Sequence, residues 1–357
     1  MLKADFLPVF RISGSNYDIG LNIGRKFKER IHRAFKESKR IKNLRIRDNL
    51  KPDWLNRVEQ RAKNHFPHLM DEISGIADGA GLEYRDVLAV NFQHAIPPFE
   101  DCSTVIFKGS EKILHVHNED HYTDLGNNAY LLIVEMDNGT TFFAHAYAGC
   151  IPGTSFGFNS HGIVMSCNAL PDPVRENGLP RILFGRSILE AKNLDDALKR
   201  ALSFIPRSGG VSYNLTSMNE KRVINLETTA DEGCITEIQN NYFRTNHYIS
   251  DKFKDRSIPE ESNSLDRYMR GLELISGVEK TGEGALQILS EDIIFFTSFR
   301  LSSGEELRTL CTALFEVDNS INLRLYPGKQ EKKEFMKFSL SDLESGKCVP
   351  HSCRSTS

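Results

Sequence analysis

The stretch that decides the fold is Asp101-Cys102-Ser103-Thr104-Val105-Ile106-Phe107, where an irregular segment gives way to a β-branched run. Pro97 and Pro98 lie just upstream and block a helix, so we expect an extended approach to Cys102. The β-branched residues that follow predict a strand. Cleavage of the peptide bond before Cys102 would make this residue a new N-terminus. Its α-amine, with an unperturbed pKa of roughly 7.7–8.0, could then accept the proton of its own thiol.

The residues before Cys102 carry a helical pattern. Four apolar residues recur at every fourth position and so share one face of a helix: Ile19, Ile23, Phe27 and Ile31. Ser15 or Asn16 is the expected N-cap of this helix. Further amphipathic stretches predict helices that begin near residues 52, 67 and 83. We therefore expect this part of the chain to supply packing more than chemistry.

From Cys102 onward the apolar pattern changes to a period of two, which is typical of strands. Strands are predicted at 104–108, 113–117, 129–135, 141–147, 157–159, 163–167, 212–218, 222–227, 234–239, 242–245, 309–317 and 321–326. Helices are predicted at 179–204 and 265–275. This order of elements predicts an α+β fold, in which two packed antiparallel sheets lie between helices as a four-layer αββα sandwich.

Composition is typical of a soluble enzyme. The 357 residues include 39% hydrophobic ones, and 45 basic against 48 acidic residues give a formal net charge of −3. This balance provides no field that would attract nucleic acid or an anionic membrane. Seven cysteines, an odd number without a regular framework, favour a reducing compartment. The first residues lack the apolar run of a signal peptide, so we expect a cytoplasmic protein.

Five short motifs together resemble one family of enzymes. They are Cys102-Ser103-Thr104, His117-Asn118-Glu119-Asp120, Tyr147-Ala148-Gly149, Asn159-Ser160-His161-Gly162 and Asn263-Ser264-Leu265-Asp266-Arg267. In order and spacing they resemble the peptidase C45 group, also known as the acyl-CoA:6-aminopenicillanic acid acyltransferase family of N-terminal-nucleophile (Ntn) hydrolases. The resemblance is strongest to the insect Tan-type N-β-alanyl-dopamine hydrolases. It implies the Ntn-hydrolase fold and self-cleavage into a helical fragment, 1–101, and a catalytic fragment, 102–357, that stay associated.

The resemblance also implies roles for particular residues. It makes Cys102 the nucleophile, Asp120 the acid beside it, Asn214 the donor to the oxyanion, and Ser264 and Arg267 the residues that orient the site. The bond that is cut would join Asp101 to Cys102. Family members usually carry Gly where this chain has Asp101, whose β-carbon and charge disfavour the strained backbone that cleavage needs.

Three histidines near Cys102 suggest an alternative kind of active site, one that binds a metal ion. His115 and His117 share one face of a predicted strand, and His121 follows with Glu119 and Asp120 nearby. This spacing suits a metal-dependent amidohydrolase. We favour a position for His117 beside Cys102 in substrate orientation, without a metal or other cofactor. A papain-type Cys-His-Asn site is a further option, but its local cysteine signature is absent.

The sequence therefore predicts a self-processing cysteine amidohydrolase that cleaves a linear N-acyl amine, such as a β-alanyl or other aminoacyl amide. The first alternative is acyl transfer from acyl-CoA to an amine, because the same acyl-enzyme serves both reactions. An unprocessed binding protein is also left open, since Asp101 could block cleavage. The expected partners are a small-molecule acyl amine and the chain's own N-terminal fragment, in a monomer or a homo-oligomer.

Overall fold

The computed structural model describes residues 7–50, 52–92, 102–260, 262–300, 304–329, 334–345 and 351–354. The Pro97-Pro98 segment and Asp101, on which the cleavage prediction depends, lie outside these described residues.

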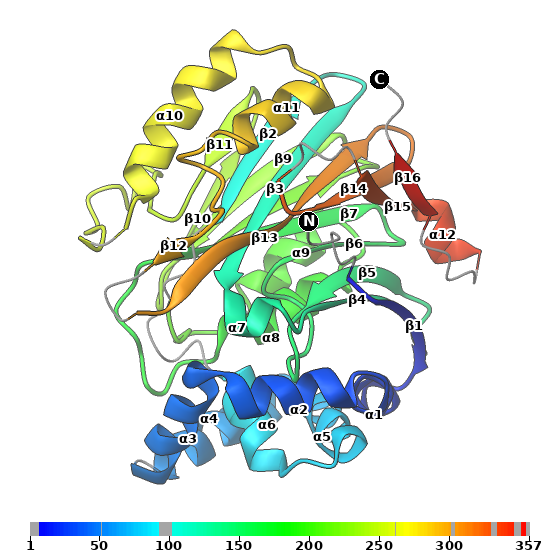
Figure 1. Cartoon of the computed structure of the whole chain (residues 1–357), viewed down its shortest axis with the longest axis vertical. Coiled ribbons are helices and arrows are strands. Elements are labelled where there is room, and N and C mark those ends of the chain that lie inside the picture. Colours follow the sequence, from blue (N-terminus) through cyan, green and yellow to red (C-terminus); the bar gives the residue numbers. More distant parts are fainter. Residues whose placement is uncertain are drawn as a thin grey trace.

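The N-terminal part is mainly helical and gathers at one end of the molecule, in blue to cyan (Figure 1). Its elements are β1 (Val9–Gly14), α1 (Asn16–Lys26), α2 (Lys28–Glu37), α3 (Lys39–Leu50), α4 (Pro52–His65), α5 (Pro67–Ala80) and α6 (Tyr84–Asn91). Helix α1 begins where Ser15 accepts a hydrogen bond from the main-chain nitrogen of Asp18, whose carboxylate accepts one in return. Strand β1 was not predicted from the sequence, because its alternation is short and ends where the helical pattern begins.

Helices α1 and α5 pack with their backbones in close contact. A β-carbon added at Gly20 would lie 1.9 Å from the main-chain oxygen of Glu72, and one at Gly75 would lie 2.2 Å from that of Tyr17. Only glycine fits at these two positions, so the glycines in this segment set the distance between the helices.

One sheet, called sheet A, has the strand order β1-β4-β5-β6-β7-β8-β9-β10. Its strands after β1 are β4 (Tyr130–Met136), β5 (Thr141–Ala146), β6 (Phe156–Asn159), β7 (Ile163–Leu170), β8 (Gly210–Ser217), β9 (Arg222–Thr228) and β10 (Gly233–Glu237). They pair in antiparallel fashion, except that β1 runs parallel to β4. Between β7 and β8 the chain forms α8 (Arg181–Ile188) and α9 (Leu194–Ala201).

The other sheet, sheet B, has the order β11-β2-β3-β13-β14-β15-β16, and β12 also pairs with β13. Its strands are β2 (Ser103–Lys108), β3 (Ile113–Tyr122), β11 (Tyr242–Arg244), β12 (Phe299–Arg300), β13 (Glu306–Val317), β14 (Ile321–Pro327), β15 (Glu334–Ser339) and β16 (His351–Arg354). The associated helices are α7 (Thr123–Gly126), α10 (Ser264–Gly277), α11 (Gly282–Leu289) and α12 (Leu340–Glu344). Helix α11 packs on β2 and β3, and α10 packs on the edge strand β11 (both in yellow in Figure 1).

Three hydrophobic cores establish the layers. Side chains alternate along each strand, so one face of each sheet meets the other sheet and the opposite face meets helices. The core between the sheets includes Leu131, Ile133, Ala313 and Phe315. The core between sheet A and its helices includes Leu132, Val134, Ile73 and Ile182, and that between sheet B and its helices includes Val105, Leu314, Ala285 and Ile288. The predicted αββα arrangement is confirmed.

Two local predictions were less accurate than the layer order. The segment 179–204 forms two helices instead of one, because the side chain of Asn193 accepts a hydrogen bond from the main-chain nitrogen of Asp196 and caps α9. Helix α11 and the strands β15 and β16 were not predicted, so sheet B extends beyond the predicted strand 321–326. None of the described helices combines the length and the apolar composition that crossing a membrane requires.

A buried ion-pair network joins the N-terminal part to the rest. The guanidinium of Arg186 in α8 contacts Glu72 of α5 at 2.9 Å and Glu190 at 2.9 Å, and both Arg186 and Glu72 are fully buried. Glu72 also accepts a hydrogen bond from Asn16 at 2.9 Å. Charges that are buried and satisfied in this way become costly when one partner is removed.

We expect Arg186→Met to lower the free energy of unfolding by about 3–5 kcal/mol, because two buried carboxylates would lose their shared cation. Urea denaturation measures this change. The control is Arg175→Met, which breaks an ion pair with Asp231 whose side chains are 56% and 52% exposed. That variant should lose no more than about 1 kcal/mol. Equal losses in the two variants would contradict the structural role of Arg186.

Candidate active site

Cys102 lies at the start of β2, and its surroundings fix its position. The residue is 4% exposed. Its main-chain oxygen accepts hydrogen bonds from Asn168 Nδ2 at 2.9 Å and from Arg267 Nη1 at 3.2 Å. Its Sγ lies 3.9 Å from the main-chain oxygen of Asp120. The thiol is therefore buried next to the acidic residue that the sequence placed beside it.

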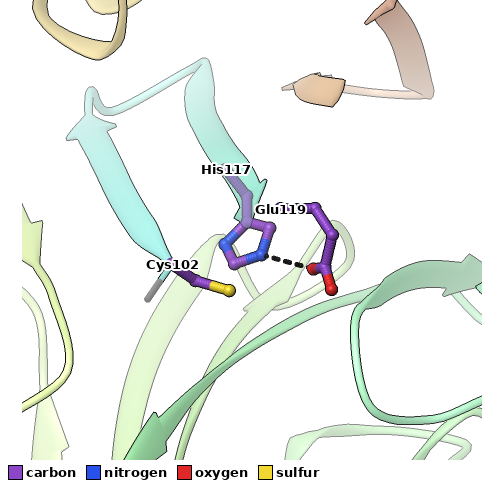
Figure 2. Close-up of side chains that lie close together, drawn as sticks. All are labelled: Cys102, His117 and Glu119. Atoms are coloured by element: carbon purple, nitrogen blue, oxygen red, sulfur yellow. Dashed lines mark hydrogen bonds and ion pairs between the residues drawn. The ribbon is translucent and has the colours of Figure 1, made fainter. Parts of the chain in front are cut away.

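The hairpin of β2 and β3 brings His117 to the thiol. Thr104 pairs with His117 in the register of the two strands, and His117 Nδ1 lies 2.9 Å from Thr104 Oγ1. On the other side of the ring, Nε2 lies 3.1 Å from Glu119 Oε2. Figure 2 shows the Cys102 thiol, the His117 ring and the Glu119 carboxylate close together. One potential ligand atom from each lies within 4.8 Å of the others.

The charge on Glu119 is stabilised by its neighbours. Burial by itself would raise the pKa of Glu119, but the hydrogen bond and the charge of His117 hold this pKa below its usual value. Tyr147 donates a further, short hydrogen bond to the same carboxylate. The same charge acts on Cys311, because burial and then the nearby Glu119 and Asp120 raise the pKa of its thiol well above its usual value. Glu119 therefore stays ionised, and Cys311 stays protonated.

The set of histidines suggested as metal ligands does not come together around one point. His115 Nε2 lies 2.8 Å from Ser166 Oγ and His115 Nδ1 lies 3.1 Å from Thr216 Oγ1. Burial and the neighbouring His117 lower the pKa of His115 to about 3, so it is neutral at pH 7. Among the described residues, the atoms that could share a cation come instead from Cys102, His117 and Glu119. Thiolate, imidazole and carboxylate are all zinc ligands. A metal-dependent enzyme would therefore bind its ion through these three residues instead of the three histidines.

Asn214 lies one side chain away from Cys102. Its Nδ2 donates to Asn168 Oδ1 at 2.9 Å and to Ser166 Oγ at 3.2 Å, and its Oδ1 accepts from Asn225 Nδ2 at 2.9 Å. Asn168 is the residue that reaches the Cys102 oxygen. Asn168 was not among the predicted site residues, because it lies one position beyond the predicted strand 163–167, whereas β7 continues to Leu170. The assignment of Asn214 to the oxyanion stays a prediction.

Of the two predicted orienting residues, Arg267 lies closer to Cys102 than Ser264 does. Arg267 is fully buried on α10 and donates to the main-chain oxygen of Cys102, to Ser103 Oγ at 2.8 Å and to Asn246 Oδ1 at 3.1 Å. Ser264 Oγ accepts a hydrogen bond from the main-chain nitrogen of Asn246 at 2.7 Å. Arg267 thus contacts Cys102 directly, while Ser264 supports the loop that holds Arg267.

Comparison with known proteins identifies the family. Residues 107–330 match the acyl-coenzyme A:6-aminopenicillanic acid acyl-transferase family. The chain belongs to this family. The resemblance found in the five motifs is confirmed.

Two proteins of known activity are similar to this chain in sequence. The beta-alanyl-dopamine/carcinine hydrolase of Drosophila melanogaster is 26% identical over 218 residues, which cover 54% of this chain and 56% of that protein. The 40 kDa form of the acyl-coenzyme A:6-aminopenicillanic-acid-acyltransferase of Emericella nidulans is 26% identical over 249 residues, or 67% of this chain and 68% of that one. The match thus spans little more than half the length of the hydrolase.

Among solved structures, this chain is similar to a variant of the conjugated bile acid hydrolase of Clostridium perfringens. The TM-score is 0.48 at 12% sequence identity, and the alignment covers 71% of this chain and 97% of that one.

We expect the purified protein to contain no stoichiometric zinc, because both ring nitrogens of His117 are already engaged by Thr104 and Glu119. Elemental analysis of the purified chain measures the metal content. Activity should also survive exhaustive chelation. One zinc per chain that is absent from the Cys102→Ala variant would instead assign the site to the metal-dependent alternative.

Proposed function

We propose that this chain is an Ntn-type cysteine amidohydrolase that processes itself before Cys102 and then cleaves a linear N-acyl amine. The observation that carries the proposal is the placement of Cys102. Its thiol lies beside His117 and the main chain of Asp120, and two side-chain donors hold its carbonyl oxygen. The acyl group that we favour is a β-alanyl or another aminoacyl group. The name of the Drosophila relative supports this choice.

The reaction would proceed in two halves. The free α-amine of Cys102 takes the thiol proton, and Sγ attacks the carbonyl carbon of the amide. The resulting oxyanion receives hydrogen bonds, and the C–N bond breaks as the Cys102 ammonium returns the proton to the leaving amine. Water then attacks the thioester, the C–S bond breaks, and the acid and the free thiol are released. Asp120 would orient the amine, while its charge raises the amine's pKa.

Acyl transfer is the second candidate. The Emericella relative carries this activity in its name, and a thioester on Cys102 could form from acyl-CoA and pass its acyl group to an amine. The deciding experiment is incubation of the purified protein with a panel of acyl amines, with and without acyl-CoA and an acceptor amine.

We propose that the hydrolysis takes place in the cytoplasm. The N-terminal fragment would stay bound to the catalytic fragment, and the processed protein would form a monomer or a homo-oligomer.

We expect mass spectrometry of the purified protein to find two fragments, 1–101 and 102–357, because Cys102 Sγ can attack the peptide bond that precedes it. The Cys102→Ala chain should stay whole. Cleavage that persists in this variant would show that another protease makes the cut. A wild-type chain that stays whole and yet hydrolyses amides would require a separate base, and His117 is then the first candidate.

We expect Asn214→Ala to lower kcat by about 10²–10³ with a much smaller change in KM, because an oxyanion donor acts mainly in the transition state. Steady-state kinetics on the preferred acyl amine provide both constants. The control is Asn219→Ala in an exposed turn, and the Tm and the processing of each variant are compared with wild type. A folded, processed Asn214→Ala enzyme with nearly normal kcat would contradict the assignment. A large loss in Asn168→Ala alone would then transfer the role to Asn168.

A further inference from the structure

A group of buried titratable side chains extends from the thiol into the space between the two sheets. Glu119 is its only carboxylate, and its oxygens are contacted by Tyr147 and by His117. The rings of His121 and His145 lie 4.2 Å and 5.0 Å from the ring of Tyr147. All five side chains are at least 95% buried, with exposures from 0% to 3%. Of these five residues, the proposed hydrolysis could use only His117. The burial of the other four titratable side chains beside the thiol therefore needs a separate explanation.

His145 indicates that the group is built to receive a ligand. It lies on β5 two residues after Phe143, so both point into the core between the sheets. It is 1% exposed, and both of its ring nitrogens are buried with no hydrogen-bond partner among the residues that the structure describes. Buried polar atoms normally have a partner, and leaving one unsatisfied is costly. The ring of His145 lies 5.0 Å from the ring of Tyr147, whose hydroxyl donates to the Glu119 carboxylate, so His145 belongs to the same buried cluster as that carboxylate.

The charge of this group favours a cation. Burial lowers the pKa of His145 to about 4, so its imidazole is neutral at pH 7 and adds no positive charge beside Glu119. An ionised carboxylate has about four acceptor positions. His117 and Tyr147 occupy two of them and the Ser155 hydroxyl interacts with the same carboxylate, which leaves about one. A buried carboxylate with remaining acceptor capacity attracts an ammonium group, which has three donors.

The distance from the nucleophile fits a short aminoacyl group. A carboxylate oxygen of Glu119 lies within 4.8 Å of Cys102 Sγ. In a β-alanyl thioester the ammonium nitrogen is four bonds from the sulfur, and four bonds of about 1.5 Å span about 5 Å. An acyl group of this length, bonded to Cys102, can therefore place its nitrogen at hydrogen-bonding distance from Glu119, about 2.8 Å.

We infer that Glu119, with Tyr147 and His145 beside it, binds the ammonium group of the substrate's acyl part and so selects aminoacyl amides over neutral acyl amides. This inference rests on the proposed function, because it assigns the acyl side of the same thioester. Glu119 contacts substrate in this arrangement, Tyr147 positions the carboxylate, and His145 accepts a further hydrogen bond from the ammonium group.

The test compares two amides of the same fluorogenic amine, one with a β-alanyl group and one with a butanoyl group, in which methyl replaces ammonium. The measured quantity is the ratio of the two kcat/KM values. Wild type should favour the β-alanyl amide by about a hundredfold, and Glu119→Gln should abolish most of this preference, as expected when a buried charge pair is lost. Glu119→Asp keeps the charge on a shorter side chain and should retain part of it. Tyr147→Phe, which removes only a hydrogen bond to Glu119, should reduce the ratio by less than tenfold.

Two kinetic outcomes would contradict the inference and leave the proposed amide hydrolysis intact. One is a wild-type enzyme that hydrolyses both amides equally well. The other is a Glu119→Gln enzyme in which both rates fall together, since Glu119 would then act only by positioning His117. Calorimetry with β-alaninamide and butanamide gives a readout that needs no turnover. Tighter binding of β-alaninamide that is lost in Glu119→Gln supports the inference even if neither fluorogenic amide is hydrolysed, a result that would contradict only the proposed hydrolysis. Equal binding of the two amides contradicts the inference.

Discussion

The main-chain oxygen of Cys102 is the atom on which the site depends. Asn168 reaches it from β7 in sheet A, Arg267 reaches it from α10, and Cys102 itself directly precedes β2 of sheet B. Two hydrogen bonds to one oxygen therefore connect three of the four layers. Because charge-assisted bonds from a buried guanidinium are strong and directional, the start of β2 is held in a fixed position relative to both sheets. A nucleophile needs such fixation, since catalysis depends on the placement of the reacting atom.

Polar side chains occupy positions between the sheets that would otherwise be apolar. Elsewhere in this layer, Leu131 of β4 and Phe315 of β13 belong to a hydrophobic core. Near Cys102 the layer contains His117, Glu119 and Asn214 instead, each bonded to other side chains. A buried polar network stabilises a core less than apolar packing does unless all of its groups have partners. We therefore interpret the polar side chains near Cys102 as serving function, while the apolar part of the layer supplies the stability.

The buried contacts of the N-terminal part bear on the retention of a cleaved fragment. Arg186 of α8 lies between Glu72 of α5 and Glu190, and α1 packs against α5 through glycines that admit no side chain. Strand β1 adds a run of main-chain hydrogen bonds along β4. These contacts do not depend on the peptide bond before Cys102, so a cut there would leave them in place.

The sequence by itself determined the class of the fold and the family, and it predicts Cys102 as the nucleophile. The apolar pattern located ten strands between Cys102 and Thr245, because successive side chains of a strand point to opposite faces and a period of two can therefore be read from the local sequence. The five motifs identified the family. They placed Asp120 and Arg267 near Cys102 because the order of such motifs reflects a shared fold.

Only the tertiary structure decided which side chains meet. The contacts of Cys102 with Asn168 and Arg267 join residues 66 and 165 positions apart, and no local pattern encodes them. The pairing of Thr104 with His117 depends on the register of a hairpin, and the isolation of His115 from the suggested metal ligands depends on hydroxyl groups of strands in the opposite sheet. From the sequence, Glu119 was known only to lie two residues after His117. Its burial between the sheets, close to the Cys102 thiol, follows from packing, because both sheets together set the position of a side chain in a layered core.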